Sequence, residues 1–375
     1  MIRDSARAFA QERLAPTAAD RDRGKDFPRD EMAELGALGL LGMLVPEALG
    51  GVGADHVSYV MAVEEIAAAD GSIGAMMALH NGLVSSPLLH HGSEMQKSRY
   101  LRPLAEGKIN GAFGLTEPEA GSNAFAIATK ARRCDGGYRL SGTKQFMSNG
   151  KSADIAIVFA AVDSDDPRRR ITAFLVPPSS PGYAVLRVED KLGLSASETC
   201  QVGLGDVFVP DDHVLGAVGG GYALAMGTLE LGRLGIAAQS VGLARAAFDL
   251  AHAYALERRT FGKLLIEHQA VSFRLADMRI KVETARCYLH HAARLRDAGQ
   301  TCKTEAAMAK LYASEIAEWV ASEAIQVHGG YGYLKDFAAE RIYRDARICR
   351  IYEGTSDIQR MIVAAELSGS VRARA

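Results

Sequence analysis

The residues best placed to do chemistry lie near the end of the chain, where residues 350–360 read RIYEGTSDIQR. The carboxylate of Glu353 stands there between an aromatic residue and a small polar turn. Gly354 allows the backbone to bend sharply beside this carboxylate. Each of the next residues can cap a helix, whose free N–H groups favour an anionic or polar ligand group: Thr355, Ser356 and Asp357. The pattern indicates either an acid–base site or a loop with one exposed Glu before a helix.

Two stretches in the middle of the chain offer hydroxyl and backbone donors beside predicted strands. Residues 113–123 read FGLTEPEAGSN, and residues 142–149 read GTKQFMSN. Such turns could hold the edge of a flavin ring and a pyrophosphate, although an ordinary polar turn uses the same residue types. The candidate contacts are Phe113, Leu115, Thr116, Gly121, Ser122, Phe146, Met147 and Ser148.

Three further stretches carry polar residues on or beside predicted helices. Glu230 and Arg233 share one helix face. An Arg near a helix end is normally solvated, but an Arg fork and a glycine backbone also suit a diphosphate. Candidates of that kind are Arg258, Phe261, Gln269, Gln326, Val327, His328, Gly329 and Gly330.

These stretches contain four separated motifs that resemble those of the acyl-CoA dehydrogenase family, in the same order and across essentially the whole chain. The string IYEGTSDIQR resembles that family's catalytic signature, and short-, medium- and branched-chain members are the nearest. The resemblance implies that Glu353 removes a proton from the carbon next to a thioester carbonyl, while N5 of FAD accepts a hydride from the following carbon. The product would be a trans-2-enoyl-CoA, with electrons passed to an electron-transferring flavoprotein.

The resemblance also implies which residues bind FAD. The two middle stretches match the flavin motifs, with Asn123 in place of the usual Asp and Phe146 in place of the usual Trp. Thr355 and Asp357 would add contacts after the catalytic Glu. A neighbouring subunit's FAD would be reached by residues 258–269 and covered by residues 326–330. The cofactor sites would therefore require an oligomer, and we expect a homotetramer.

Substrate contacts follow from the same resemblance. They are Ser122, Glu230, Arg233, Glu353 and Gly354. Some relatives carry the catalytic Glu directly before the Arg of the pantetheine-contacting helix, where this chain has Gly232. Glu353 is therefore the expected base. Bulky residues in the helix expected to line the acyl cavity predict a short- to medium-chain or branched substrate: Met76, Met77 and Leu79.

Other functions remain open at this level. The same fold could host an acyl-CoA oxidase, a desulfinase or an acyl-carrier-protein-linked dehydrogenase, although Glu353 argues against relatives that lack the base. A non-catalytic helical scaffold would require every motif to be a coincidence. The histidine pairs at 90–91 and 290–291 lack ligand spacing, so we expect no metal site.

Composition excludes several classes of protein. The 375 residues are 48% hydrophobic and 23% charged, with a net charge of −2, which gives no reason to expect nucleic acid or an anionic membrane as partner. We find no signal peptide or membrane-spanning run and expect no membrane insertion. The five cysteines are scattered and without a CxxC pair, which predicts reduced thiols in a cytoplasmic protein.

The pattern of elements predicts an α+β protein of three domains: a helical domain over 1–108, an antiparallel β-barrel-like domain over 109–214, and a four-helix bundle over 215–375. Predicted helices cover 31–44, 57–69, 267–298 and 304–327. Predicted strands cover 111–115, 126–133, 138–146, 155–162, 171–176, 183–188 and 200–209. A seam of apolar residues three and four apart marks the bundle: Val271, Leu275, Met278, Val282, Ala285, Leu289 and Ala292.

Overall fold

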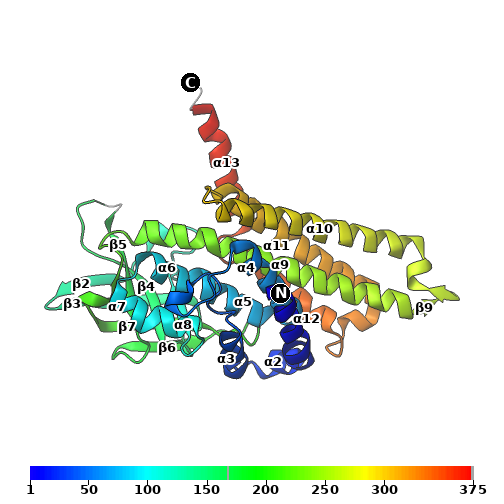
Figure 1. The fold of residues 1–375 in the computed structure, drawn as a ribbon, viewed down its shortest axis with the longest axis horizontal. Helices are drawn as coiled ribbons and strands as arrows, with labels where there is room; N and C mark the ends of the chain where they lie inside the picture. Colours follow the sequence, from blue (N-terminus) through cyan, green and yellow to red (C-terminus); the bar gives the residue numbers. More distant parts are fainter. Residues whose placement is uncertain (167–168, 373–375) are drawn as a thin grey trace.

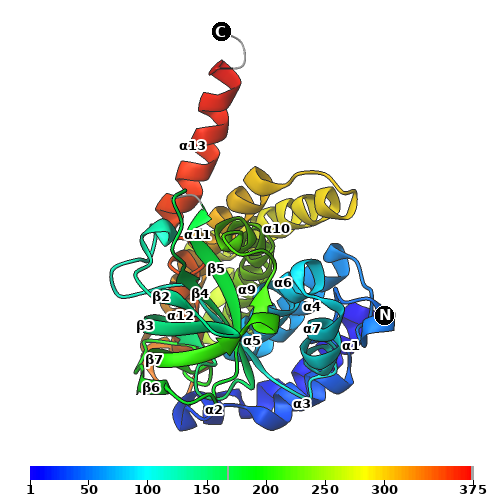
Figure 2. The same cartoon turned by 90° about the vertical axis from the view of Figure 1, so that its left-hand side faces the viewer.

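The computed structural model describes residues 1–166 and 169–372, with side chains described up to residue 369. Short N-terminal helices and a β-sheet lie along one side and one end of a group of long helices (Figure 1). The C-terminal helix leaves the body of the molecule and projects from it (Figure 2). The predicted succession of helices, strands and helices is confirmed.

The N-terminal helices are short, and several continue directly into one another. Their bounds are α1 Ile2–Phe9, α2 Ala18–Gly24, α3 Arg29–Ala37, α4 His56–Ala69, α5 Gly71–Leu79, α6 Ser86–His91, α7 Glu94–Gln96 and α8 Arg102–Ala105. A π-helical segment, His80–Ser85, joins α5 to α6. Asp70 caps α5, since its side chain accepts the N–H groups of Ser72 and Ile73. Every residue of α5 and of the π-helical segment is buried.

The helix predicted over 31–44 is too long. Helix α3 ends at Ala37, and Gly39 adopts a φ of 75°, in the left-handed region. Leu38, an apolar residue of the predicted helix, is 49% exposed. A glycine in this conformation ends a helix more readily than an apolar repeat extends it, and this accounts for the error.

The central strands form one mixed sheet, not a purely antiparallel one. The strands are β1 Gly111–Gly114, β2 Lys130–Cys134, β3 Gly137–Ser148, β4 Ile155–Ala161, β5 Ile171–Val176, β6 Tyr183–Val188, β7 Thr199–Pro210 and β8 Val214–Leu215, in the order β6-β7-β3-β2-β4-β5-β8 with β1 beside β4. Both β1 and β2 run parallel to β4. These two pairings depart from the expected antiparallel arrangement, because the segments between the strands are long enough to cross over, as parallel pairing requires. The other neighbouring strands of this sheet pair antiparallel, as expected.

The strand predicted over 126–133 starts later than expected. Residues 124–126 form a 3₁₀ turn, and β2 begins at Lys130. The backbone N–H groups of Ala128 and Thr129 donate hydrogen bonds to the carboxylate of Glu117. These backbone donors therefore serve a side chain and cannot join the sheet ladder.

After the sheet the chain is helical again, and all of these helices except the projecting last one pack into the body of the molecule. They are α9 Gly221–Glu257, α10 Gln269–Asp297, α11 Lys303–His328, α12 Ala338–Arg347 and α13 Ser356–Arg372; a small hairpin, β9 Arg259–Thr260 and β10 Lys263–Leu264, joins α9 to α10. The predicted seam of α10 is buried from Leu275 onward, while Val271 is partly buried. One hydrophobic cluster runs from α1 and α4 through α9, α10 and α11, so N-terminal and C-terminal helices share a core.

Two kinds of feature are absent from the described residues. No helix in residues 1–166 or 169–372 is both long and apolar enough to cross a bilayer. Within the same ranges, no group of three or more His, Cys, Asp or Glu side chains is arranged to hold a metal ion.

Candidate active site

Glu353 lies in a tight turn that the surrounding residues hold in an unusual conformation. Glu353 has a φ of 52° and Gly354 a φ of 93°, both in the left-handed region, which is uncommon for a Glu. Thr355 is the N-cap residue of α13, and its Oγ1 accepts a hydrogen bond from the N–H of Ile358 at 3.3 Å. The buried Gln359 donates to the carbonyls of Glu353 and Gly354 at 3.2 and 2.8 Å. A conformation that costs free energy is thus fixed by specific bonds.

The carboxylate of Glu353 points at a glycine of α9. Its Oε2 is shielded from solvent and has no hydrogen-bond partner. A Cβ atom at Gly232 would lie 2.0 Å from this oxygen and 2.9 Å from Cδ2 of Leu83. The carboxylate of Glu353 and any side chain at 232 would therefore occupy the same space. The two alternative positions for the base, separate in sequence, are adjacent in the fold.

Burial and two nearby cations set the charge state of Glu353. Burial raises the pKa of this carboxyl to about 7, while the positive charges of Lys310 and Arg233 oppose the rise. Burial lowers the pKa of Lys310 to about 8, against the raising effects of Cys349 and Glu353. The pKa of Arg233 is also lowered by burial, and its Nε has no partner. A carboxylate with a pKa near neutrality is suited to take up a proton at physiological pH.

Sequence reasoning missed Lys310, which lies in the middle of α11. Its side chain is fully buried, and its Nζ donates to the carbonyl of Gly354 at 2.7 Å. It stands among the alanines of the buried face of α11, near Ala306 and Ala313. A lysine at a core position of a predicted helix is the signal that could have found it, because buried lysines are nearly always paired.

The two middle stretches lie against each other, as expected for one binding site. The N–H of Gln145 donates to the carbonyl of Thr116 at 2.9 Å. Lys144 is fully buried and forms an ion pair of 2.7 Å with Glu117. These bonds join the loop after β1 to strand β3. Phe146 follows at an irregularity in the pairing of β3 with β7, has a φ of 55°, and is 64% exposed.

The flanking candidates of these stretches have mixed surroundings. Phe113 packs edge-on against Phe159, and Leu115 and Met147 are buried. Gly121 and Ser122 are exposed, and Thr116 and Ser148 are partly exposed. Leu115 belongs to the same hydrophobic cluster as Leu83, which adjoins the space between Gly232 and Glu353. The loop after β1 is therefore connected, through this cluster, to the surroundings of Glu353.

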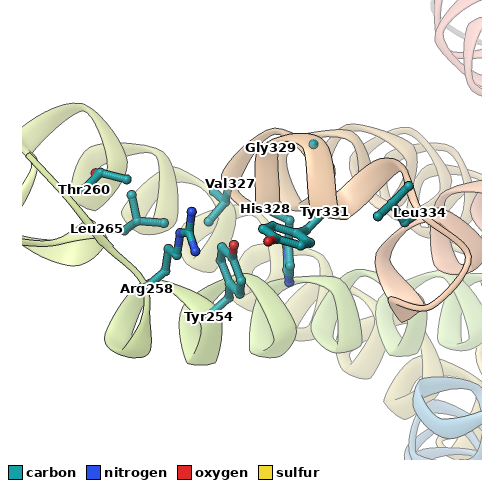
Figure 3. A pocket seen from close by; sticks show the side chains of 10 residues that line it. Tyr254, Arg258, Thr260, Leu265, Val327, His328, Gly329, Tyr331 and Leu334 are labelled. Carbon is teal, nitrogen blue, oxygen red and sulfur yellow. The ribbon is translucent and has the colours of Figure 1, made fainter.

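A second group of candidates lines a pocket between the end of α9 and the end of α11 (Figure 3). The pocket has a volume of ≈ 430 Å³ and is lined by Tyr254, Arg258, Thr260, Leu265, Val327, His328, Gly329, Gly330, Tyr331 and Leu334. The guanidinium of Arg258 lies 5.5 Å from the ring centre of Tyr331. Phe261, at the tip of the hairpin, is 97% exposed, and Gln269 and Gln326 are exposed outside the pocket lining.

The structure separates these two groups of candidates. The sheet lies at one end of α9 and the hairpin at the other (Figure 1). Helix α9 has 37 residues, about 55 Å at 1.5 Å per residue. Residues of one chain therefore cannot all contact one small ligand.

The remaining candidates lie on α9 and at the start of α13. Glu230 pairs with Arg296 at 3.1 Å and accepts from Cys302. Arg233 is buried close enough to Glu353 to influence its pKa. The side chain of Asp357 is 89% exposed, 3.7 Å from Arg360.

Comparison with known proteins identifies the family. Models of the N-terminal, middle and C-terminal domains of acyl-CoA dehydrogenase match residues 1–108, 112–207 and 219–368. The mitochondrial short-chain specific acyl-CoA dehydrogenase of Mus musculus is 44% identical over 372 residues, which cover 99% of this chain and 90% of that protein. The chain belongs to the acyl-CoA dehydrogenase family. It is accordingly an FAD-dependent oxidoreductase that acts on acyl-CoA.

Two further relatives are informative. The solved structure of butyryl-CoA dehydrogenase from Megasphaera elsdenii superposes with a TM-score of 0.95 at 40% identity, covering 98% of this chain and 97% of that one. A subunit of the caffeyl-CoA reductase–Etf complex of Acetobacterium woodii is 41% identical over 368 residues, 98% of this chain and 97% of that protein. The fold expected for an acyl-CoA dehydrogenase is thus confirmed along nearly the whole chain.

The side chains of this acyl-CoA dehydrogenase fit FAD. The exposed rings of Phe146 and Phe261 are large apolar groups that a flavin or adenine ring would cover. The pocket presents Arg258 beside Gly329 and Gly330, a donor set that suits a diphosphate. No described feature of either group conflicts with an anionic, aromatic cofactor.

Proposed function

We propose that this acyl-CoA dehydrogenase oxidises short-chain acyl-CoA thioesters, with butyryl-CoA as a representative substrate, and that Glu353 is its base. The observation that carries the proposal is the solvent-shielded, unpartnered Oε2 of Glu353, whose carboxyl pKa is raised to about 7. Relatives that cover nearly the whole chain are a short-chain specific enzyme and a butyryl-CoA dehydrogenase. Both names support a short acyl group.

In this proposal Glu353 takes the proton from the carbon next to the thioester carbonyl. Burial makes its carboxylate a stronger base than in water, because the charged form has lost its hydration. The negative charge that develops on the thioester oxygen requires a donor, and we assign the backbone N–H of Glu353 to it. Bound FAD supplies the acceptor for the hydride that leaves the next carbon. Arg233 and Glu230 are assigned to the CoA portion.

Lys310 and Gln359 serve this step through the backbone. Both donate to the carbonyl of Gly354, and Gln359 also donates to that of Glu353. They hold the turn so that the carboxylate faces α9. The charge of Lys310 also keeps the pKa of Glu353 from rising further.

We infer that FAD is bound between two subunits. Phe113, Leu115, Thr116, Gly121, Ser122, Phe146, Met147, Ser148, Thr355 and Asp357 are assigned to the flavin side, and Arg258, Phe261, Gln269 and residues 326–330 to a neighbour's FAD. Support comes from the separation of the two groups along the 37 residues of α9. The projecting α13, with Met361 and Leu367 exposed, offers further surface for assembly. A homotetramer would use both surfaces.

We further infer an electron-transferring flavoprotein as the electron acceptor and a cytoplasmic location. A relative in an Etf complex supports the first inference. For the second, all five cysteines are free, as is typical of proteins in a reducing compartment.

The test is turnover of a panel of straight, branched and dicarboxylic acyl-CoAs with a dye as electron acceptor. We expect the highest kcat/KM with a C4 thioester, and loss of most turnover in Glu353→Gln. Near-normal turnover by Glu353→Gln would overturn the assignment of the base. Rapid stoichiometric peroxide formation in air would instead favour an oxidase.

A further inference from the structure

Tyr59 is a fully buried residue of α4 whose hydroxyl lies between α5 and α9. A Cβ atom at Gly235 of α9 would lie 2.6 Å from this hydroxyl oxygen, and one at Gly82 would lie 3.9 Å from it. The hydroxyl donates to the carbonyl of Ala78 at 3.4 Å. It therefore stands where the π-helical segment and α9 face each other through glycines.

The same glycines lead back to the catalytic carboxylate. Gly232 and Gly235 are three residues apart on α9 and share a face of that helix. Gly232 faces Oε2 of Glu353, whereas Gly235 faces the hydroxyl of Tyr59. A Cβ at Gly82 would lie 3.5 Å from Cα of Gly232, so Gly82 of the π-helical segment faces the same part of α9. The glycine face of α9 thus has Glu353 at one end and Tyr59 at the other.

We propose that Tyr59 closes the inner end of the acyl site and limits the length of the acyl chain. The inference rests on the proposed function, since it requires the acyl chain to run along α9 from the carbon that Glu353 deprotonates. Three residues of helix advance about 4.5 Å, the length of a few methylene groups. An acyl chain longer than that meets the tyrosine ring.

The alternative is a tyrosine that merely fills the core. Its hydroxyl, however, has a poor bond, because 3.4 Å exceeds the usual range for an O–H donor. Phenylalanine would fill the same space without burying this polar group. The charge of Glu353 also contributes to the raised pKa of Tyr59, which puts the hydroxyl within electrostatic reach of the base.

Met76 and Met77 remain neighbours of this end of the site. Both are buried in the same hydrophobic cluster as Tyr59 and Ala78. Their side chains belong to the core around Tyr59, and in this proposal the ring of Tyr59 makes the contact with the end of the acyl chain.

The experiment compares kcat/KM for octanoyl-CoA and butyryl-CoA in FAD-loaded enzyme. Tyr59→Ala should raise the ratio of kcat/KM for octanoyl-CoA to kcat/KM for butyryl-CoA at least about tenfold. Accommodating one more methylene group in an apolar pocket changes kcat/KM by about that factor. Tyr59→Phe keeps the ring and is the matched control, with a ratio close to that of the unmodified enzyme. A ratio compares two substrates on one enzyme, so a general loss of stability does not alter it.

A second variant tests the same part of the site and keeps the ring of Tyr59 in place. Removal of a buried ring leaves a destabilising cavity, which this variant avoids. The methyl group of Gly82→Ala would make ordinary contacts of 3.5 to 3.9 Å, so the fold accommodates it. Gly82→Ala should lower the ratio of kcat/KM for hexanoyl-CoA to kcat/KM for butyryl-CoA. Unchanged ratios in Tyr59→Ala and Gly82→Ala, with butyryl-CoA still oxidised, would overturn the role of Tyr59 and leave the proposed function intact. Unmodified enzyme that prefers octanoyl-CoA would overturn the proposed short-chain function itself.

Discussion

Because Gly232 lies against Glu353, the single methyl group added by Gly232→Ala tests the proposal that Glu353 is the base. In Gly232→Ala the new Cβ would lie 2.0 Å from Oε2, whereas ordinary contact begins at 3.4 Å. The carboxylate must therefore move by roughly 1.4 Å. Displacement of a reacting group by about 1 Å can cost on the order of 10²-fold in rate. We expect kcat for butyryl-CoA to fall by at least about that factor.

The stability of this variant should change little. The clashing atoms, Oε2 of Glu353 and Cδ2 of Leu83, are the ends of flexible side chains, which can rotate away. Alanine is also favoured over glycine inside a helix by about 1 kcal/mol, which offsets part of any strain. Gly242→Ala on the same helix is the matched control, because its Cβ would lie 2.4 Å from the backbone carbonyl of Glu64. That variant should lower the melting temperature without touching Glu353.

The assay is dye-coupled turnover together with thermal unfolding of each variant. Adding Gly232→Ala to Glu353→Gly should cost no further activity, since the carboxylate that clashes is gone and the two effects are not additive. A Gly232→Ala enzyme with near-normal kcat would refute the reasoning. So would a rate loss explained entirely by a lower melting temperature.

Further predictions concern the proposed base, its charge state and the binding of the cofactor. Glu353→Gln should lose roughly 10² to 10⁴ in rate, as is typical for a general base, while absorbance and calorimetry still detect bound FAD and substrate; lost binding would contradict this. In the pH profile of kcat/KM, activity should fall as pH drops through about 7, because Glu353 must be ionised and its pKa is raised to that value. Lys310→Met removes a charge that stabilises the carboxylate, so the midpoint should move to higher pH; an unmoved midpoint would limit Lys310 to a structural role. Arg258→Ala should weaken FAD retention, and light scattering of the unmodified enzyme should give about four times the chain mass of 40.1 kDa; a monomer with full FAD would contradict both. Gly232→Glu combined with Glu353→Gly should recover part of the activity that Glu353→Gly loses, and the same dye assay measures it.

Local patterns in the sequence predicted most elements because those patterns depend on neighbours along the chain. The seam of α10 repeats every three or four residues, and its buried positions from Leu275 onward confirm it. Gly329, with a φ of 61°, ends α11 as expected. The failures at residues 31–44 and 126–133 have local causes too, a left-handed Gly39 and a carboxylate of Glu117 that takes two backbone donors.

The sequence by itself determined the order of helices and strands and singled out Glu353 within its glycine-containing turn. It could not place Lys310 or Tyr59 beside that turn, because those contacts join residues far apart in the chain. Only the packing of α4, α9 and α11 brings Tyr59, Gly232 and Lys310 near one carboxylate. The parallel pairing of β1 with β4 was likewise decided by the tertiary fold. Burial is a property of the whole packed molecule, and burial is what raises the pKa of Glu353 to about 7, as the proposed role of a base requires.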